Sequence, residues 1–456
     1  MITSQLAEFV AALKLAELPA PLVARTKLLL LDCIGNIIRA RMEAESTPAL
    51  LRAVKALGLD VGQARVFGDK QSYGPAGAVL INATLAHSLD FDDTHAAAIV
   101  HAAAPVIPAA LGAAEMVNAS GADLLTAIIA GYEVALRLAL ALPAGAHYER
   151  GFHPSATCGV FGAAAAAARI FGLDAAETTN AFGIALSQSA GSLQFLANGA
   201  WTKRFQVGWA GMAGFVAATL AREGFIGAAE PLEGRHGFLH IYAPAPVPER
   251  VVQDLGSVWE TMNMGVKPYP SCRWAHAGID AALALRAEHN LNPQDIESVT
   301  LGISRAGMLL VGEPAAKKAN PENIVDAQFS GPFVIANALL YGQMGWDSYK
   351  HLGDSELTSL IQRIRCENDP EIEAEFPANM SGKITLQAGG QTYTKTVIIP
   401  KGDPDNFPSP AALQEKFTSL AAPSIGMAAT ALLAKTILNC ERLNAATALF
   451  STESAT

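Results

Sequence analysis

Residues 87–101, called here the acidic segment, bring several side chains that can transfer protons together in an otherwise uncharged part of the chain. The segment contains three imidazoles, three carboxylates and the hydroxyl of a threonine: His87, His95, His101, Asp90, Asp92, Asp93 and Thr94. Long uncharged, Ala-rich stretches flank it on both sides. Because burying a charge is costly unless the charge is paired or used, this segment is the first candidate for chemistry.

Two plainer interpretations of the acidic segment stay open from the residues alone. Asp93 or Thr94 could cap a helix, with solvated acids beside it. A metal site is disfavoured, because His95 and His101 are six residues apart rather than at the i, i+4 spacing of helical ligands. The segment also lacks the Gly and the later Glu of a calcium-binding EF-hand loop. We therefore predict acid–base chemistry without a metal.

Two further polar groups stand out in an apolar context. His153 immediately precedes Pro154, a favourable first residue for a helix, and the backbone N–H groups of a helix start attract anions. Lys203 and Arg204 precede an uncharged run that ends only at Arg222. Lys203 could neutralise a substrate carboxylate. The alternatives are a core imidazole bonded to a carbonyl and a solvated pair of cations.

The second half has one dense polar stretch, residues 266–276, in which two prolines stiffen the loop. Lys267 and His276 are candidate acid–base groups, and Tyr269 and Arg273 are candidate binding groups. Neither GxGxxG nor GxxxxGK[ST] occurs, so no nucleotide-binding motif is present. This set of side chains predicts cofactor-independent proton transfer on a small anionic substrate.

Composition limits the possible architectures and partners. A chain of 456 residues predicts two domains, and 51% hydrophobic with 16% charged residues predicts a mainly helical protein with an apolar subunit interface. The net charge of −10 argues against nucleic acid as a partner. Five cysteines without a CxxC pair, and no basic segment before an apolar one at the N-terminus, favour a cytoplasmic location. The uncharged runs 96–114 and 205–221 are expected to be buried helices and not membrane spans.

The pattern of elements divides the chain. Helices are expected over residues 4–60, 123–142 and 174–189, and a Pro-rich linker over residues 243–248. Beyond it, an alternating strand and a Gly-Gly hairpin indicate an α+β region. We predict an all-helical domain at 1–247 and 401–456, and a smaller α+β domain at 248–400.

Several ordered motifs together resemble one family, the MmgE/PrpD family, which includes 2-methylcitrate dehydratase, cis-aconitate decarboxylase and iminodisuccinate epimerase. The motifs are HSLDFDDTH, HAAAP, GFHPSATCGVFGAAAAAA, WTKRFQVGWA, EGRHGF and KPYPSCRWAHAGID. The resemblance implies a large all-helical domain built from both termini, a smaller α+β lid domain, a homodimer without cofactor and an active site between the domains. It also implies the pocket residues Asp90, Thr94, His101, His153, Lys203, Lys267 and His276.

Two departures from the family pattern bear on the reaction. Gln206 stands where many relatives have His, and Phe333 where many have Tyr. Because dehydration needs a general acid for the departing hydroxide, these losses weaken a dehydratase assignment.

We predict epimerisation of a dicarboxylate such as iminodisuccinate, with one base on each face of the stereocentre. Lys267 or His276 would act opposite His101 or His153, Lys203 would hold the carboxylate, and Asp90 would orient an imidazole. Thr94, Arg204, Tyr269 and Arg273 complete the predicted binding set. The alternatives are a 2-methylcitrate-type dehydratase, a cis-aconitate-type decarboxylase, and a binding protein without turnover.

Overall fold

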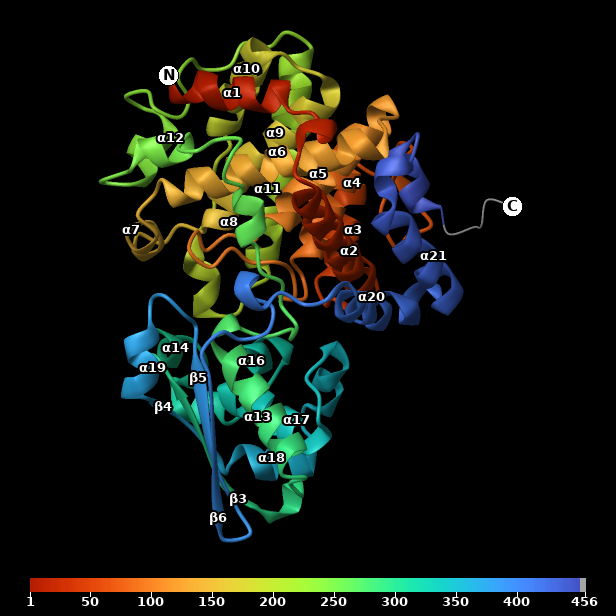
Figure 1. Ribbon diagram of the computed structural model, residues 1–456. Helices are drawn as coiled ribbons and strands as arrows, with labels where there is room; N and C mark the ends of the chain where they lie inside the picture. The colour runs from red at the N-terminus through yellow and green to blue at the C-terminus, as the bar shows by residue number, and fades with distance from the viewer. Residues whose placement is uncertain (452–456) are drawn as a thin grey trace. The chain divides into compact units, whose positions relative to one another are not determined.

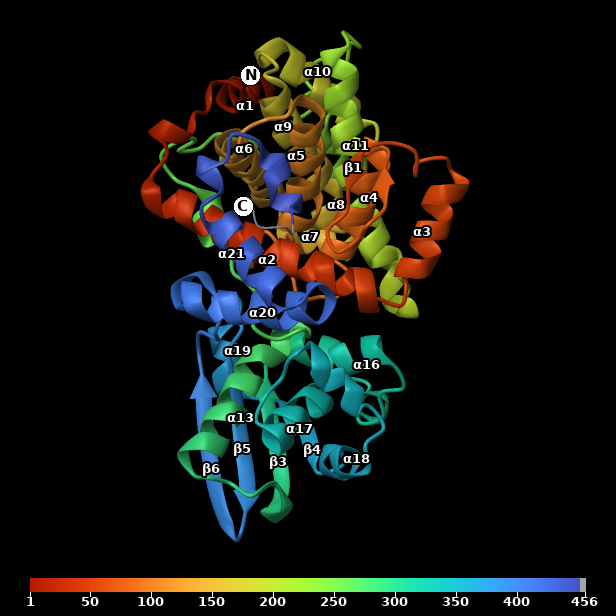
Figure 2. The same cartoon turned by 90° about the vertical axis from the view of Figure 1, so that its right-hand side faces the viewer.

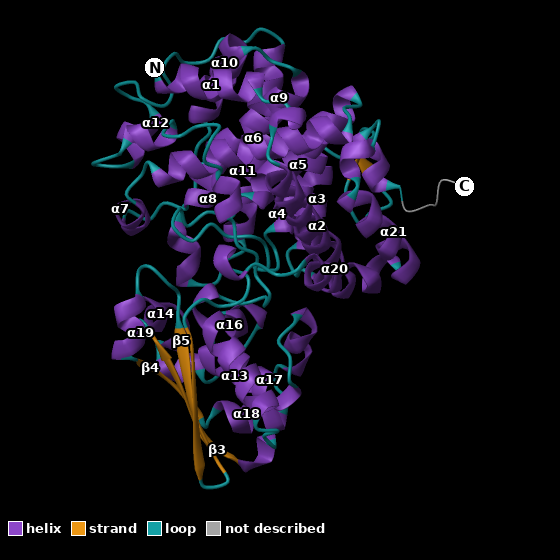
Figure 3. Cartoon of the chain, in the orientation of Figure 1, coloured by secondary structure: helices purple, strands orange, loops and turns teal. Residues whose placement is uncertain are grey.

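The computed structural model describes residues 1–451 and consists mainly of helices, as predicted (Figure 3). The chain divides into two compact units. The larger unit comprises residues 1–265 and the chain from Ser409 onward, and the smaller unit comprises Val266–Pro408. Among the described residues, no helix combines the length and the hydropathy needed to cross a membrane.

Helices rich in Ala and Gly build the larger unit (Figure 1). Their bounds are α1 Ile2–Ala12, α2 Ala20–Glu43, α3 Thr47–Ala56, α4 Pro75–Ala86, α5 Ala103–Val117, α6 Gly121–Leu140, α7 Ala144–Glu149, α8 Pro154–Thr157, α9 Gly159–Phe171, α10 Ala175–Leu186, α11 Thr202–Arg222, α12 Phe238–Tyr242, α20 Pro410–Ile425 and α21 Met427–Leu438. A two-stranded antiparallel ribbon joins β1 (Ala64–Arg65) to β2 (Ser72–Tyr73).

Small side chains let α6 and α9 approach closely. A Cβ atom added at Gly162 would lie 2.7 Å from the Gly131 carbonyl oxygen, and one added at Gly131 would lie 2.6 Å from the Gly162 carbonyl oxygen. Residues 163–168, all alanines, are completely buried around this contact. The Ala-rich sequence is therefore a packing requirement of the core as well as a helix-forming one.

Residues 248–265 belong with the larger unit, although the sequence assigned them to the smaller domain. Two buried residues of α6 hold this segment. The Arg137 guanidinium donates to the Gln253 carbonyl at 2.6 Å, and the Glu133 carboxylate accepts from the backbone N–H of Thr261 at 2.9 Å. The Pro-rich linker is thus not a unit boundary, because a buried ion pair satisfies the backbone beyond it.

A four-stranded sheet forms the centre of the smaller unit, with the strand order β4-β3-β5-β6. Its strands are β3 Ile296–Ile303, β4 Ile364–Asn368, β5 Gly382–Ala388 and β6 Gln391–Val397; its helices are α13 His276–Glu288, α14 Arg305–Gly307, α15 Ala315–Lys318, α16 Ile324–Gln328, α17 Gly331–Tyr341, α18 Ser355–Ile361 and α19 Pro370–Glu375. β3 pairs with β4 in parallel, and the other pairs are antiparallel. The predicted hairpin is confirmed: Gly389 and Gly390 have φ of +57° and +74°, as a tight β5–β6 turn requires.

The chain returns to the larger unit as α20, which runs beside α2 (Figures 1 and 2). The side chain of Lys416 of α20 is largely covered there. Its ammonium lies 2.5 Å from the Asp32 carboxylate of α2, donates to the Phe91 carbonyl at 2.7 Å and lies 3.7 Å from the centre of the Phe91 ring. Asp32, which interrupts an apolar helix in the sequence, is therefore the counter-ion of a residue almost 400 positions later.

Replacing Lys416 by Met should lower the free energy of unfolding by about 3–5 kcal/mol, because Asp32 would remain buried without its cation. Burial already raises the pKa of Asp32, against the opposing effect of Lys416. Without Lys416 the pKa rises further, so the deficit should shrink as pH falls and Asp32 becomes protonated. Urea unfolding of K416M at several pH values measures this. Glu415→Gln, at an exposed neighbour, is the matched control, and equal stability of K416M and E415Q would contradict the prediction.

Candidate functional site

The acidic segment connects α4 to α5, and its three carboxylates are buried. Asp92 is 0% exposed and Asp93 1%, so the interpretation as solvated acids is wrong. Asp93 does serve the start of α5, since its Oδ1 accepts the backbone N–H of Ala103 at 3.1 Å. Asp90 adopts φ of +53°, a left-handed conformation that Asp tolerates better than most residues. This local turn allows Asp90, Asp92 and Asp93 to point to different partners.

Three imidazoles and one carboxylate form what we call the imidazole cluster: His87, Asp92, His101 and His153. The His87 ring centre lies 4.8 Å from that of His101 and 6.0 Å from that of His153. Asp92 Oδ2 lies 2.7 Å from His87 Nδ1 and 3.7 Å from His101 Nδ1. The side chains of His87 and Asp92 are completely buried, whereas that of His101 retains 14% exposure. Within the cluster, His101 is therefore accessible to a ligand.

A backbone carbonyl fixes the tautomer of His101. His101 Nδ1 lies 2.7 Å from the carbonyl oxygen of Asp93, and a carbonyl can only accept, so Nδ1 carries a hydrogen. Thr94 Oγ1 lies 3.3 Å from the same nitrogen. The neutral ring therefore has its lone pair on Nε2, which is the nitrogen able to exchange a proton with a substrate.

His153 lies at the start of α8, as predicted, but α8 is only four residues long and continues into α9. Its Nδ1 lies 2.7 Å from the side-chain amide nitrogen of Gln206 on α11. Burial lowers the pKa of His153 well below its ordinary value, and the nearby His87 and Lys203 lower it further, against the opposing effect of Asp90. His153 is therefore a neutral imidazole.

The first turn of α11 places Lys203 and Arg204 in different surroundings. Lys203 Nζ lies 2.5 Å from Asp90 Oδ1, and Arg204 donates to Ser46 Oγ at 3.3 Å. Burial alone would lower the pKa of Lys203, but the charge and hydrogen bond of Asp90 raise it above its ordinary value. Lys203 remains an ammonium with 20% of its side chain exposed, and one carboxylate cannot use all three of its N–H groups.

The partners of the carboxylates in the acidic segment differ from those that the sequence predicted. Asp90, expected to orient an imidazole, pairs with Lys203, and Asp92, expected to be support, lies against two imidazoles. Asp93 accepts a hydrogen bond of 2.8 Å from the Tyr132 hydroxyl of α6. Burial, with a contribution from Asp92, raises the pKa of Asp93 well above its ordinary value. Tyr132 was missed, although a lone phenol in an apolar helix is a detectable signal.

The predicted support role of His95 agrees with its surroundings. His95 Nδ1 accepts the backbone N–H of Ala98 at 3.1 Å, so the ring hydrogen is on Nε2, which faces Glu260 at 3.3 Å. The hydrogen bond from His95 is the main reason that the pKa of Glu260 falls to about 2. This pair connects the acidic segment to residues 248–265, within the larger unit.

The smaller unit holds the remaining predicted residues in a network of its own. The Tyr269 hydroxyl donates to Asp280 Oδ1 at 2.5 Å, and burial, reinforced by Asp280, raises the pKa of Tyr269. Arg273 pairs with Asp403 and donates to the Lys401 carbonyl at 3.0 Å. Tyr269 and Arg273, predicted to bind substrate, thus have protein partners that fix the loop at residues 266–276.

His276 is completely buried, and both of its ring nitrogens face protein groups. Nε2 donates to the Ser271 carbonyl at 3.1 Å, and Nδ1 lies 3.0 Å from Arg273 Nη1, which can only donate. Lys267 is 3% exposed. Phe333 stacks on Tyr349 in the core of this unit, with ring centres 5.7 Å apart. That Lys267 and His276 act together with residues of the larger unit stays a prediction.

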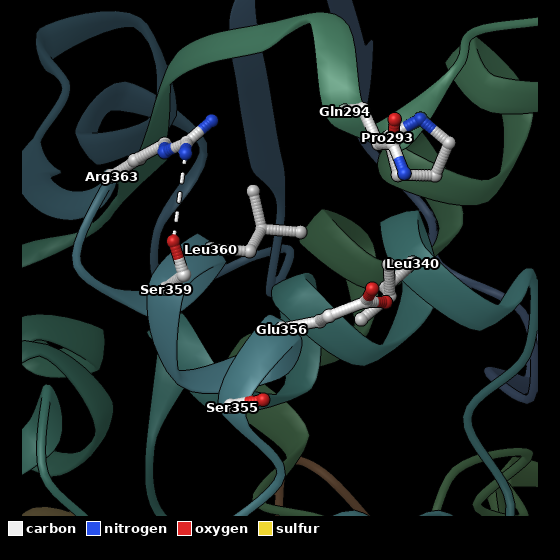
Figure 4. Close-up of a pocket in the computed structure, with 8 residues that line it drawn as sticks. All are labelled: Pro293, Gln294, Leu340, Ser355, Glu356, Ser359, Leu360 and Arg363. Carbon is white, nitrogen blue, oxygen red and sulfur yellow. Dashed lines mark hydrogen bonds between the residues drawn. The ribbon is translucent and has the colours of Figure 1, made fainter.

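Two hollows elsewhere in the protein do not combine imidazoles with a carboxylate as the imidazole cluster does. One of about 290 Å³ in the smaller unit has Glu356 and Arg363 on its wall, and Arg363 donates to Ser359 Oγ (Figure 4). One of about 620 Å³ in the larger unit has the charged residues Arg65, Asp69 and Lys70 on its wall. Neither is lined by an imidazole, so the imidazole cluster is the better candidate for acid–base chemistry.

Three residues of the cluster also satisfy the spacing of a metal site. One potential ligand atom from each of His87, Asp92 and His101 lies within 4.8 Å of the others. The Nδ1 atoms of both rings face oxygen atoms at 2.7 Å, namely Asp92 Oδ2 and the Asp93 carbonyl. These are hydrogen-bond distances, so the arrangement is explained by proton sharing. The absence of a resident metal stays a prediction.

Comparison with known proteins gives matches along almost the whole chain. Residues 4–250 match the MmgE/PrpD N-terminal domain and residues 269–440 match the MmgE/PrpD C-terminal domain. Cis-aconitate decarboxylase-like protein oryM of Aspergillus oryzae is 28% identical over 96% of this chain and 94% of its own length. Cis-aconitate decarboxylase of Homo sapiens is 26% identical over 97% and 92%. Cis-aconitate decarboxylase of Aspergillus terreus is 26% identical over 92% and 89%.

The buried neutral state of His153 has a measurable effect on stability. Below pH about 6.5 the unfolded chain binds a proton at this residue and the folded chain does not, so the stability of the wild type decreases as the pH decreases, by up to about 1.4 kcal/mol per pH unit. In His153→Asn this contribution is absent. The free energy of unfolding of the wild type minus that of H153N should decrease from pH 7 to pH 5. A difference that is constant or increases over this range would contradict a neutral His153.

Proposed function

Because the chain belongs to the MmgE/PrpD family, we propose that it is a lyase that decarboxylates a small tricarboxylate of the cis-aconitate type by acid–base chemistry. The main support from the site is the accessible His101 of the imidazole cluster, whose tautomer is fixed, together with the Lys203 ammonium paired with Asp90. The relatives' names favour this lyase, which the sequence analysis kept as an alternative. They give no support to the predicted epimerase.

The proposed reaction moves one electron pair through an allylic system. In cis-aconitate a carboxylate is carried by a CH₂ group next to a carbon–carbon double bond. When its C–C bond breaks, CO₂ leaves and the bonding pair forms a new double bond to the CH₂ carbon. The former π pair then accepts a proton at the carbon beside another carboxylate, which gives a methylene-substituted dicarboxylate. The enzyme must therefore stabilise charge on a carboxylate and deliver one proton.

Lys203 has the properties for the first task. Its ammonium persists because the pKa is raised, and it keeps exposed surface beside Asp90. A substrate carboxylate that gains negative charge during CO₂ loss would interact more strongly with this cation than the ground state does.

His101 has the properties for the second task. As an imidazolium it would donate its Nε2 proton to carbon, while Nδ1–H stays on the Asp93 carbonyl. The Asp92 carboxylate, 3.7 Å from the ring, compensates the positive charge before transfer. The 14% exposure of the side chain would allow the ring to take up a new proton from solvent. Independence from cofactors, a homodimer and a cytoplasmic location stay predictions from the sequence.

The reaction is tested by incubating the full-length protein with cis-aconitate in D₂O and following the products by NMR. We expect release of CO₂ and a methylene-substituted dicarboxylate with one deuterium beside a carboxylate. C–H exchange without loss of CO₂ would instead favour an isomerase, and addition of water would favour a hydro-lyase. No exchange and no turnover with any di- or tricarboxylate would overturn the enzyme assignment.

Lys203→Met should lower kcat/KM about 10²–10³-fold, because the cation for the charged transition state is lost. The double variant D90N/K203M also removes the charge of Asp90, which K203M leaves without the Lys203 ammonium, and Asn also tolerates the positive φ at position 90. It should recover stability without recovering activity. Lys55→Met, at an exposed lysine, is the control and should keep full activity. Wild-type rates in K203M, or recovery in the double variant, would remove Lys203 from the proposed role.

A further inference from the structure

The side chain of Gln206 bridges two groups that differ in what they can donate. Its Oε1 lies 2.9 Å from the backbone nitrogen of Ser192, and its Nε2 lies 2.7 Å from His153 Nδ1. The sequence presents Gln206 as the loss of a titratable ring. In the structure it is a link between a fixed backbone donor and an imidazole of the cluster.

The hydrogen-bonding capacity of these groups determines the tautomer of His153. A backbone N–H can only donate, so the atom of Gln206 that faces Ser192 must be its oxygen. The atom that faces His153 is therefore the amide NH₂, which also can only donate. His153 Nδ1 must accept and so carries the lone pair, and the hydrogen of the neutral ring is on Nε2.

The backbone holds both partners of the Gln206 amide, Ser192 and His153, in place. Residues 151–153 run beside residues 191–193 as a short antiparallel bridge, in which the His153 N–H donates to the Gly191 carbonyl at 3.2 Å. Ser192, which orients the amide, is thus fixed to the same segment as the ring that the amide contacts. The hydrogen-bond chain cannot reverse by rotating the amide alone, because Ser192 N–H would then face NH₂.

The charge state of His153 makes the tautomer decisive. The ring is buried, and the titratable groups around it are His87, Lys203, Asp90 and His147. Their combined effect with burial keeps the ring neutral, so it cannot act through a positive charge. What it can offer to a ligand depends only on which nitrogen carries the hydrogen.

We propose that Gln206 is a positioning residue that holds His153 as the Nε2–H tautomer, and thereby makes His153 a neutral hydrogen-bond donor to a substrate carboxylate. The substrate part of this inference rests on the proposed function, whereas the tautomer does not. His101 and His153 then have opposite roles, since Nδ1 carries the hydrogen in one ring and Nε2 in the other.

Gln206→Glu provides a sharp test. The carboxylate can still accept from Ser192 N–H, but it presents an acceptor instead of a donor to His153 Nδ1. The hydrogen should therefore move to Nδ1, and the imidazolium of His153 should persist to higher pH. Full-length protein labelled with ¹⁵N in its histidine rings reports both changes through the ring nitrogen shifts, and the His153 signals are identified by their absence in H153N.

Gln194→Glu is the matched control, because it places the same charge two residues from Ser192 on an exposed side chain. Its His153 spectrum should equal that of the wild type. A wild-type His153 with the hydrogen on Nδ1, or a Q206E spectrum without change at His153, would overturn the inference.

Activity provides a separate readout. If cis-aconitate is decarboxylated, Q206E should lower kcat about 10- to 100-fold with a smaller change in KM, since a hydrogen bond to a carboxylate that gains charge is stronger in the transition state than in the ground state. A Q206E enzyme with wild-type kcat would overturn the substrate part of the inference. If no carboxylate is turned over, the proposed function fails while the NMR result still decides the tautomer.

Discussion

Lys416 donates to the Phe91 carbonyl while its ammonium lies against the Asp32 carboxylate and the Phe91 ring, and the candidate site depends on this contact. The acidic segment has few regular backbone hydrogen bonds, so its course must be fixed by side chains. Lys416 holds the residue between Asp90 and Asp92. By holding Phe91, α20 therefore helps to fix the position of Asp90, which pairs with Lys203, and of Asp92, which lies against the imidazoles.

Burial in an Ala-rich helical unit leaves little freedom in how polar atoms are satisfied. A backbone carbonyl orients His101, an amide orients His153, and a carboxylate faces His87. Asp93 is held by a phenol and a backbone N–H, and burial raises its pKa. The same contacts that make buried charge tolerable therefore also prescribe which nitrogen of each ring can exchange a proton.

The sequence predicted what depends on local pattern and composition. Helical periodicity, the hairpin with Gly389-Gly390 and the apolar surroundings of the acidic segment were all visible in it. The partners were not, because they depend on contacts distant in the chain. Nothing near Asp90 in the sequence indicates Lys203 as its partner, and nothing near Asp32 indicates Lys416. From the sequence, Gln206 was interpreted only as the loss of a histidine. The hydrogen bonds of its amide to Ser192 and His153 depend on contacts that the sequence does not show.

The position of Lys416 also has a consequence for synthesis. The smaller unit is one continuous segment, Val266–Pro408, so all of it leaves the ribosome before α20 does. A nascent chain that has already released α2 and the acidic segment still lacks the cation that compensates Asp32. The larger unit therefore cannot complete its interior until the whole of the smaller unit has been synthesised. A strictly N-terminal-first order of domain folding therefore cannot complete the larger unit, because the segment that carries Lys416 follows the smaller unit in the chain.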